Sequence, residues 1–417
     1  MNEQTTVLTK APGFRWAMLF LNILAYGQFF LTVQLPTVFS SYIQEGLNVS
    51  PTLVSLCGTI ILGVFAVTGS LGASVTSKIG LKKSLCVAIL VNIAGALLVM
   101  VLGHSFPGYV VCCAIQGLSG GLICSAVTTI NVYWFPVRER GFASGLLLGI
   151  LGVAFSIDTF FAPILMASGI SWQMGASLLS AIPSAIILIV YFLFAREVEQ
   201  VYPGHLTVAE MLPSEEASSP KFDVEKLPKS MPELRKHSYF WFACICGFIT
   251  GANVYGFPSF VGGLLVEKGL DSTLANAVTG ITFFTSILGS PLGGWISDKI
   301  FKGSRWQIVC IGNLIIVACL AIVGISNGTL LAVAMVVAYA AVSTVMGPFW
   351  AIPAELGHPS KAAPASGFVL VWGNLGGTII GFILTALATS TGTYYVPMAV
   401  CLVMALVSGL LITRVKR

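Results

Sequence analysis

Charge is scarce in this chain. Only 9% of its 417 residues are Asp, Glu, Lys or Arg, and 56% are hydrophobic, whereas a soluble domain carries about 25% charged residues. A soluble fold of this length could not bury so much apolar surface, so we expect lipid to be its main solvent. The basic residues form no stripe with interleaved aromatic residues, so we expect no nucleic-acid partner.

Motifs for cofactors and metals are also missing. No glycine-rich phosphate loop ending in Lys-Ser/Thr is present, which argues against ATP hydrolysis. The ten cysteines all fall in apolar segments without histidines at zinc-site spacing, and we expect them to pack as small hydrophobes. The apolar segments hold no nucleophile–base pair, so we expect no enzyme, no cofactor and no metal.

Long apolar runs dominate the chain. Runs of about 20 residues span a bilayer as helices, and continuous rather than alternating hydrophobicity argues against barrel strands. The first run is too long for the core of a signal peptide. The sequence therefore predicts an all-α membrane protein with twelve transmembrane helices at 14–38, 51–77, 84–103, 107–134, 142–168, 174–195, 239–265, 274–297, 306–326, 329–353, 365–389 and 393–413.

Basic residues predict how these helices are oriented. With this assignment of spans, 20 of the 21 Lys and Arg residues lie on one side of the membrane, and Lys268 lies on the other. Positive loops face the cytoplasm. We therefore expect a multi-pass protein of a bacterial-type inner (plasma) membrane with both termini cytoplasmic.

The two halves of the chain repeat each other at a constant offset. Pro36 recurs as Pro258, Glu45 as Glu267, and the Ala-Ser-Gly at 143–145 recurs at 365–367. Six helices per half make these parallel repeats, a recognised transporter design with the solute between the repeats. We predict an N-terminal six-helix bundle at 1–195, a cytoplasmic linker at 196–238 and a C-terminal six-helix bundle at 239–417.

A loop motif strengthens this interpretation. The chain reads Gly-Trp-Ile-Ser-Asp-Lys at 294–299, and Trp134 to Gly145 links the predicted fourth and fifth helices. These segments resemble the major facilitator superfamily, and the resemblance extends over nearly the whole chain. It implies two six-helix bundles related by a pseudo-twofold axis, secondary transport by alternating access, and a latch between the bundles at their cytoplasmic ends.

In that latch, Asp298 is implied to hold the halves together near the start of the fifth helix. The first copy of the motif departs from the pattern, because Ser77 stands where an aspartate is expected; the matching latch of the first half is then weaker, or its lysines only set the topology. The residues assigned to the latch are Gly294, Asp298, Lys299, Arg305, Lys78, Gly80, Lys82, Arg138 and Arg140.

Asp158 is the one acidic residue near the middle of a predicted span. An isolated carboxylate in hydrocarbon is costly, so it should face the bundle interior or a water-filled cavity. Burial favours its protonated form, which suits a proton carrier. The alternatives are pairing with a cationic solute, or a packing role in which Asp158 bonds to Ser156, Thr159 or a neighbouring helix.

No Lys, Arg or His lies in the middle of a predicted span, so an anion would need helix N-termini, hydroxyls or amides. Polar and aromatic residues do gather on the helices that line the central cavity in the resembled family, and they suit a small, partly apolar organic solute; interhelical packing is the alternative for each one. The predicted solute-binding residues are Asn22, Tyr26, Phe30, Gln34, Gln116, Asn253, Tyr255, Tyr339, Trp350, Trp372 and Asn374.

The sequence thus predicts a monomeric secondary transporter in the lipid bilayer, coupled to protons through Asp158. The family likeness of the 134–145 link favours uptake of a small organic metabolite such as a carboxylate. The fifth helix lacks the Gly-Pro of antiporters, with no proline before Pro163. Two alternatives stay open: an efflux antiporter for amphiphilic compounds, and a membrane sensor that does not transport.

Overall fold

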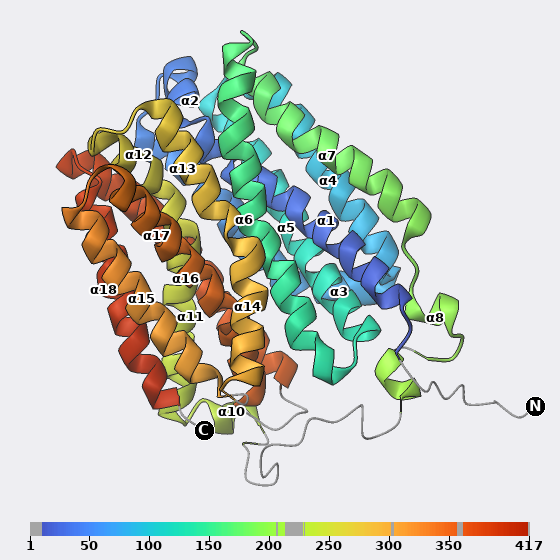
Figure 1. The fold of residues 1–417 in the computed structure, drawn as a ribbon. Coiled ribbons are helices and arrows are strands. Elements are labelled where there is room, and N and C mark those ends of the chain that lie inside the picture. The colour runs from blue at the N-terminus through green and yellow to red at the C-terminus, as the bar shows by residue number, and fades with distance from the viewer. Residues whose placement is uncertain are drawn as a thin grey trace, which may run out of the picture.

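The computed structural model describes residues 11–205, 207–212, 228, 230–301, 304–356 and 362–415. These residues form helices and no strands. Most helices run roughly side by side, and the start of α1 and the end of α18 lie at one end of the molecule (Figure 1). We call this end the terminal end and the opposite one the far end.

The first group of long helices follows the chain in order. Short segments connect them, and a short helix, α2, precedes α3 at the far end (Figure 1). The bounds are α1 (Phe14–Val38), α2 (Ser40–Leu47), α3 (Pro51–Ile79), α4 (Leu81–Leu102), α5 (Phe106–Trp134), α6 (Val137–Ala167) and α7 (Trp172–Phe194).

Short elements at the terminal end lead to the second group. These are α8 (Val198–Val201), the 3-10 helix η1 (Val208–Met211) and α10 (Met231–Leu234). The second group comprises α11 (Ser238–Gly256), η3 (Phe257–Ser259), α12 (Val261–Glu267), α13 (Ser272–Phe284), α14 (Ser286–Lys299), α15 (Arg305–Ile325), α16 (Gly328–Glu355), α17 (Ala362–Thr391), α18 (Tyr395–Ile412) and η5 (Thr413–Val415).

The predicted all-α membrane fold is confirmed. Among the described residues, 11 helices are long and apolar enough to cross a membrane. The remaining predicted span, 274–297, is two consecutive helices that meet at Thr285. The Thr285 hydroxyl donates to the Thr282 carbonyl at 2.7 Å, a local bond that competes with regular helix bonding. The 239–265 span is likewise interrupted after Gly256, because Pro258 has no backbone N–H.

The second group repeats the order of the first. Helix α5 begins at Phe106 and α16 at Gly328, at the offset that separates Pro36 from Pro258, and the starts of α7 and α18 differ by nearly the same amount. Within the first group α1 packs against α5, α6 and α7, and within the second α11 packs against α16, α17 and α18. The offset seen in three short motifs therefore relates whole helices.

The two groups meet through α6 and α3 of the first group. Helix α6 packs against α13, α14 and α16, and α3 packs against α17; Figure 1 shows α6 beside α13 and α14. Gly149 and Gly152 let α6 approach closely, so the Ser286 hydroxyl reaches the Gly149 carbonyl at 2.7 Å. One turn further, Ser156 donates to the Gly280 carbonyl at 2.7 Å.

Lys268 has a structural role at the far end. Its ammonium group donates to the carbonyls of Gly324 and Ser326, at 3.0 and 2.8 Å. A cation at a helix C-terminus satisfies free carbonyls and opposes the negative end of the helix dipole. The one basic residue predicted on the non-cytoplasmic side therefore caps α15.

Candidate functional site

A cluster of aromatic rings joins the two groups of helices at the centre. Phe30 of α1 and Phe155 of α6 belong to the first group, and Tyr255 of α11, Phe283 of α13 and Tyr339 of α16 to the second. Ring centroids lie 6.3 Å apart for Phe30–Tyr255, 5.8 Å for Phe155–Phe283 and 4.9 Å for Phe283–Tyr339. We call these five residues the central aromatic cluster.

Glycine and a further tyrosine shape the edges of this cluster. The Tyr255 ring lies against Gly377 of α17, where any side chain would collide with it. Tyr26 packs edge-on against Phe30 at 4.8 Å, and its hydroxyl lies 3.7 Å from the Cys124 sulfur of α5. Of the predicted solute-binding residues, the structure thus brings together Tyr26, Phe30, Tyr255 and Tyr339.

Asp158 lies one helical turn beyond Phe155 on α6. Its side chain is fully buried, and among the described residues neither carboxylate oxygen has a hydrogen-bond partner. The two neighbours that could have held it bond elsewhere: Ser156 donates to Gly280, and Thr159 donates to Phe155 of its own helix at 2.8 Å. A buried polar group without a partner costs about 1–3 kcal/mol, and more when charged, so Asp158 does not serve packing through hydrogen bonds.

The internal repeat predicts which part of α1 Asp158 faces. At the offset of the repeat, its counterpart is Ile380 of α17, which packs against Gly256 of α11. Gly256 is in turn the counterpart of Gln34. By this correspondence we expect Asp158 to face the Gln34 region of α1. Gln34 is buried, and no hydrogen bond joins it to Asp158.

Two other predicted residues have their side chains engaged within the first group. Asn22 donates to Asn131 of α5 at 2.9 Å and accepts from the Tyr191 hydroxyl of α7 at 3.2 Å. Gln116 packs against Gly95 of α4. Both contacts join helices of the same group, so the structure does not bring these side chains into the central aromatic cluster.

The remaining predicted residues lie on the second group. Asn253 is buried one turn before Phe257, which contacts Tyr339, and its side-chain oxygen has no partner. The ring centroid of Trp372 lies 6.2 Å from that of Trp241, a residue near the start of α11. The ring of Trp350 packs against Phe349. Trp372, Trp350 and the half-buried Asn374 therefore lie toward the terminal end of the central aromatic cluster.

Several predicted latch side chains lie outside the described residues, namely Lys78, Arg138, Arg140 and Asp298. The latch stays a prediction. Gly294 is half-buried on α14, Lys299 is exposed at its end, and Arg305 is half-buried at the start of α15. Gly80 adopts φ 87°, a left-handed conformation that favours glycine, directly before α4.

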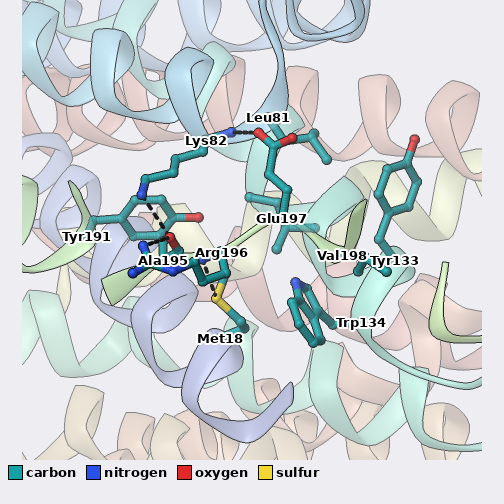
Figure 2. A pocket seen from close by; sticks show the side chains of 11 residues that line it. Met18, Leu81, Lys82, Tyr133, Trp134, Tyr191, Ala195, Arg196, Glu197 and Val198 are labelled. Carbon is teal, nitrogen blue, oxygen red and sulfur yellow. Dashed lines mark hydrogen bonds between the residues drawn. The ribbon is translucent and has the colours of Figure 1, made fainter. Parts of the chain in front are cut away.

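A carboxylate that the sequence did not single out lies at this end. The Glu197 side chain accepts a hydrogen bond from the Lys82 backbone N–H, at the start of α4, at 2.8 Å. The Lys82 ammonium group donates to the Ala195 carbonyl at 2.8 Å (Figure 2). A carboxylate at a helix N-terminus is stabilising, so Glu197 ties the segment after α7 to α4.

Phe155 and Phe283 also escaped the sequence analysis. Both are buried phenylalanines inside apolar helices, where nothing distinguishes a ring at a site from a ring in the core. The nearby Gly152 and Asp158 were the available signals for Phe155. Among the described residues, no group of three or more His, Cys, Asp and Glu is placed to hold a metal ion.

Known membrane transporters are similar to this chain over most of its length. A family model described as Major Facilitator Superfamily matches residues 18–381. The hexuronate transporter of Bacillus subtilis (strain 168) is 24% identical over 388 residues, covering 86% of this chain and 84% of that protein. The probable sulfoacetate transporter SauU of Cupriavidus necator is 21% identical over 385 residues, covering 87% and 84%.

A solved structure shares the fold. The proton:xylose symporter XylE, bound to 6-bromo-6-deoxy-D-glucose, superposes with a TM-score of 0.75 at 13% identity, covering 97% of this chain and 96% of that one.

Proposed function

Because the chain belongs to the Major Facilitator Superfamily, we propose that this secondary transporter moves a small organic solute by rocking two bundles, residues 1–195 and 239–417, about the central aromatic cluster. The cluster draws two rings from one bundle and three from the other. Rocking would therefore separate its rings and open the centre to one side of the membrane at a time.

Proton coupling through Asp158 is the central part of this proposal. The observation that carries it is a fully buried carboxyl group with no hydrogen-bond partner on either oxygen. Burial disfavours the charged form, and access to water in one state of the transport cycle would favour it. Asp158 can then take a proton on one side and release it on the other.

The orientation is proposed from charge. The described basic residues that gather at the terminal end support a cytoplasmic location for this end, in a cell with a bacterial-type inner membrane. The proposed Asp298 latch between the bundles closes this end, together with Lys299, Arg305 and Arg140. The transporter is proposed to act as a monomer.

Two classes of solute remain within this proposal. The names of the relatives, a hexuronate transporter and a probable sulfoacetate transporter, support a carboxylate as the solute. The residues of the centre give a carboxylate little to bind, since the chain has no Lys, Arg or His in the middle of a predicted span. Asp158 without a basic partner favours the second candidate, export of an amphiphilic cation in exchange for protons.

Proton movement in everted membrane vesicles tests the coupling. Adding a transported solute is expected to change the internal pH in vesicles with the unaltered chain but not with Asp158→Asn. Thr159→Val is the matched control, because its buried hydroxyl bonds only within its own helix. An unchanged proton response in Asp158→Asn would remove Asp158 from the mechanism. Absence of flux for every solute, with binding retained, would instead indicate a sensor.

A further inference from the structure

The charges near the centre are of one sign. Described basic side chains lie at helix ends, as Arg15, Lys82, Lys268, Lys299 and Arg305 illustrate, and Asp158 lies inside a span. The buried polar atoms without a partner in the described part of the chain include both oxygens of the Asp158 carboxylate and the amide oxygen of Asn253. Buried acceptors without donors are unfavourable, so the centre suits a ligand that supplies donors or positive charge.

The central aromatic cluster provides the complementary surface. The faces of aromatic rings attract cations within about 6 Å of the ring centre, most strongly where water is excluded. Phe30, Phe155, Phe283 and Tyr339 are all buried, and Tyr255 stacks across the interface between the two groups. Phe155 and Asp158 are three residues apart on α6, so the ring and the carboxyl group project from the same side of that helix.

From this arrangement we propose that the transported solute is an organic cation, an ammonium with apolar substituents, whose charge is neutralised by Asp158 and whose substituents lie among the rings of the central aromatic cluster. The inference rests on the proposed function, since it places the solute in the same path. An anion fits poorly, because it would meet a carboxylate and no basic side chain.

Competition at Asp158 gives the coupling. Either the ammonium group or a proton neutralises the carboxylate, so the one is released when the other binds. The cation is therefore exported while protons enter the cell. In the described part of the chain, the interior ionisable groups on the helices packed against α6 are phenols and thiols, which are neutral at neutral pH. They are Tyr26 of α1, Tyr109, Cys112, Cys113, Cys124 and Tyr133 of α5, Tyr191 of α7 and Tyr339 of α16.

Three probes of one shape and different charge test the inference. These are choline, the neutral carbon isostere dimethylbutanol, and the anion dimethylbutyrate, with binding to the purified full chain measured by calorimetry. We expect choline to bind at least about tenfold more tightly than dimethylbutanol, and more weakly as the pH falls. Asp158→Asn should lower the affinity for choline to that for dimethylbutanol, and it should make choline binding independent of pH. Thr159→Val should change neither.

A second variant separates the rings from the charge. Phe155→Leu removes a ring face and keeps Asp158. The affinity for choline should therefore fall several-fold, while the affinity for dimethylbutanol should change by no more than about twofold. Equal affinity for choline and dimethylbutanol, tightest binding of dimethylbutyrate, or no binding of any probe would overturn the inference. If dimethylbutyrate were taken up with protons, and Asp158→Asn abolished this uptake, the solute would not be a cation. Proton-coupled transport through Asp158 would still hold. Proton-linked transport that survives Asp158→Asn would instead remove the proposed function.

Discussion

A polar cluster between α1, α4 and α7 differs from Asp158 in how its hydrogen-bonding atoms are used. Asn92 donates to Gln28 at 2.8 Å and to Ser184 at 3.2 Å. The hydroxyl oxygens of Thr32 and Ser180 lie 2.6 Å apart and form a further hydrogen bond. All five residues are buried and each has a partner. Asp158 is buried as deeply and has none.

This difference separates stability from function. Satisfied buried networks rigidify the bundle that contains them, and this one joins three helices of one group. An unsatisfied carboxyl group weakens the fold and persists where function requires it. Polar residues in the spans therefore have to be judged by their partners rather than by their polarity.

The largest effect on stability is expected at Asn92. Asn92→Leu removes an amide that donates to Gln28, Thr32 and Ser184, and each of these three lost hydrogen bonds contributes about 1 kcal/mol. We expect a loss of roughly 3 kcal/mol or more in the free energy of unfolding, seen as a lower melting temperature in detergent. Thr159→Val serves as the control, and an unchanged melting temperature in Asn92→Leu would show that the network is dispensable.

The opposite sign is expected at Asp158. Asp158→Val replaces an unpartnered carboxyl group with an apolar side chain of similar size, so the free energy of unfolding should rise by about 1–3 kcal/mol. Proton-driven transport should disappear in the same variant. A lower melting temperature would mean that Asp158 has a stabilising partner and would cancel the contrast with Asn92.

A smaller loss is expected at Tyr191, which tests the position of Asn22. Tyr191→Phe removes the hydrogen bond to the side-chain amide oxygen of Asn22 and should cost about 1 kcal/mol of stability. Solute affinity, measured by equilibrium binding, should stay unchanged, because this bond lies within the first group of helices. A change in affinity without a change in melting temperature would restore Asn22 to the binding site.

The smallest effect is expected at Asp271, an exposed acid with a partner. It accepts a hydrogen bond from the Thr273 backbone N–H at 2.9 Å, and this bond holds the pKa of Asp271 below its ordinary value. A lowered pKa stabilises the fold above the ordinary aspartate value of about 3.9, and the benefit is lost as the pH falls through the lowered pKa. Asp271→Ala should thus lower the melting temperature slightly at neutral pH and not at strongly acidic pH. An equal change in melting temperature at neutral and at strongly acidic pH would refute the role of the Asp271 carboxylate as a helix cap.

The sequence predicted the helices well because hydrophobic length is a local property. Lipid requires each span to satisfy its own backbone, so continuous apolar runs mark the helices. The repeat that pairs Pro36 with Pro258 extended to whole helices for the same reason. The break at Thr285 was missed, because a hydroxyl that bonds to its own helix leaves no trace in hydropathy.

Side-chain direction was harder to predict. Asp158 stood out because a charge in lipid must point inward. Asn22 and Gln116 did not reveal that their partners lie on α5, α7 and α4, because contacts between helices depend on tertiary packing. Phe155 and Phe283 gave no signal, since an apolar ring fits any buried position.

The role of Asp158 as a proton carrier is tested most directly by separating exchange from gradient-driven transport. In vesicles loaded with a transported solute, Asp158→Asn is expected to keep solute-for-solute exchange, which needs only the rocking of the bundles. The same variant should fail to concentrate or expel that solute when a proton gradient is imposed. Equal gradient-driven transport in the variant and the unaltered chain would contradict the account.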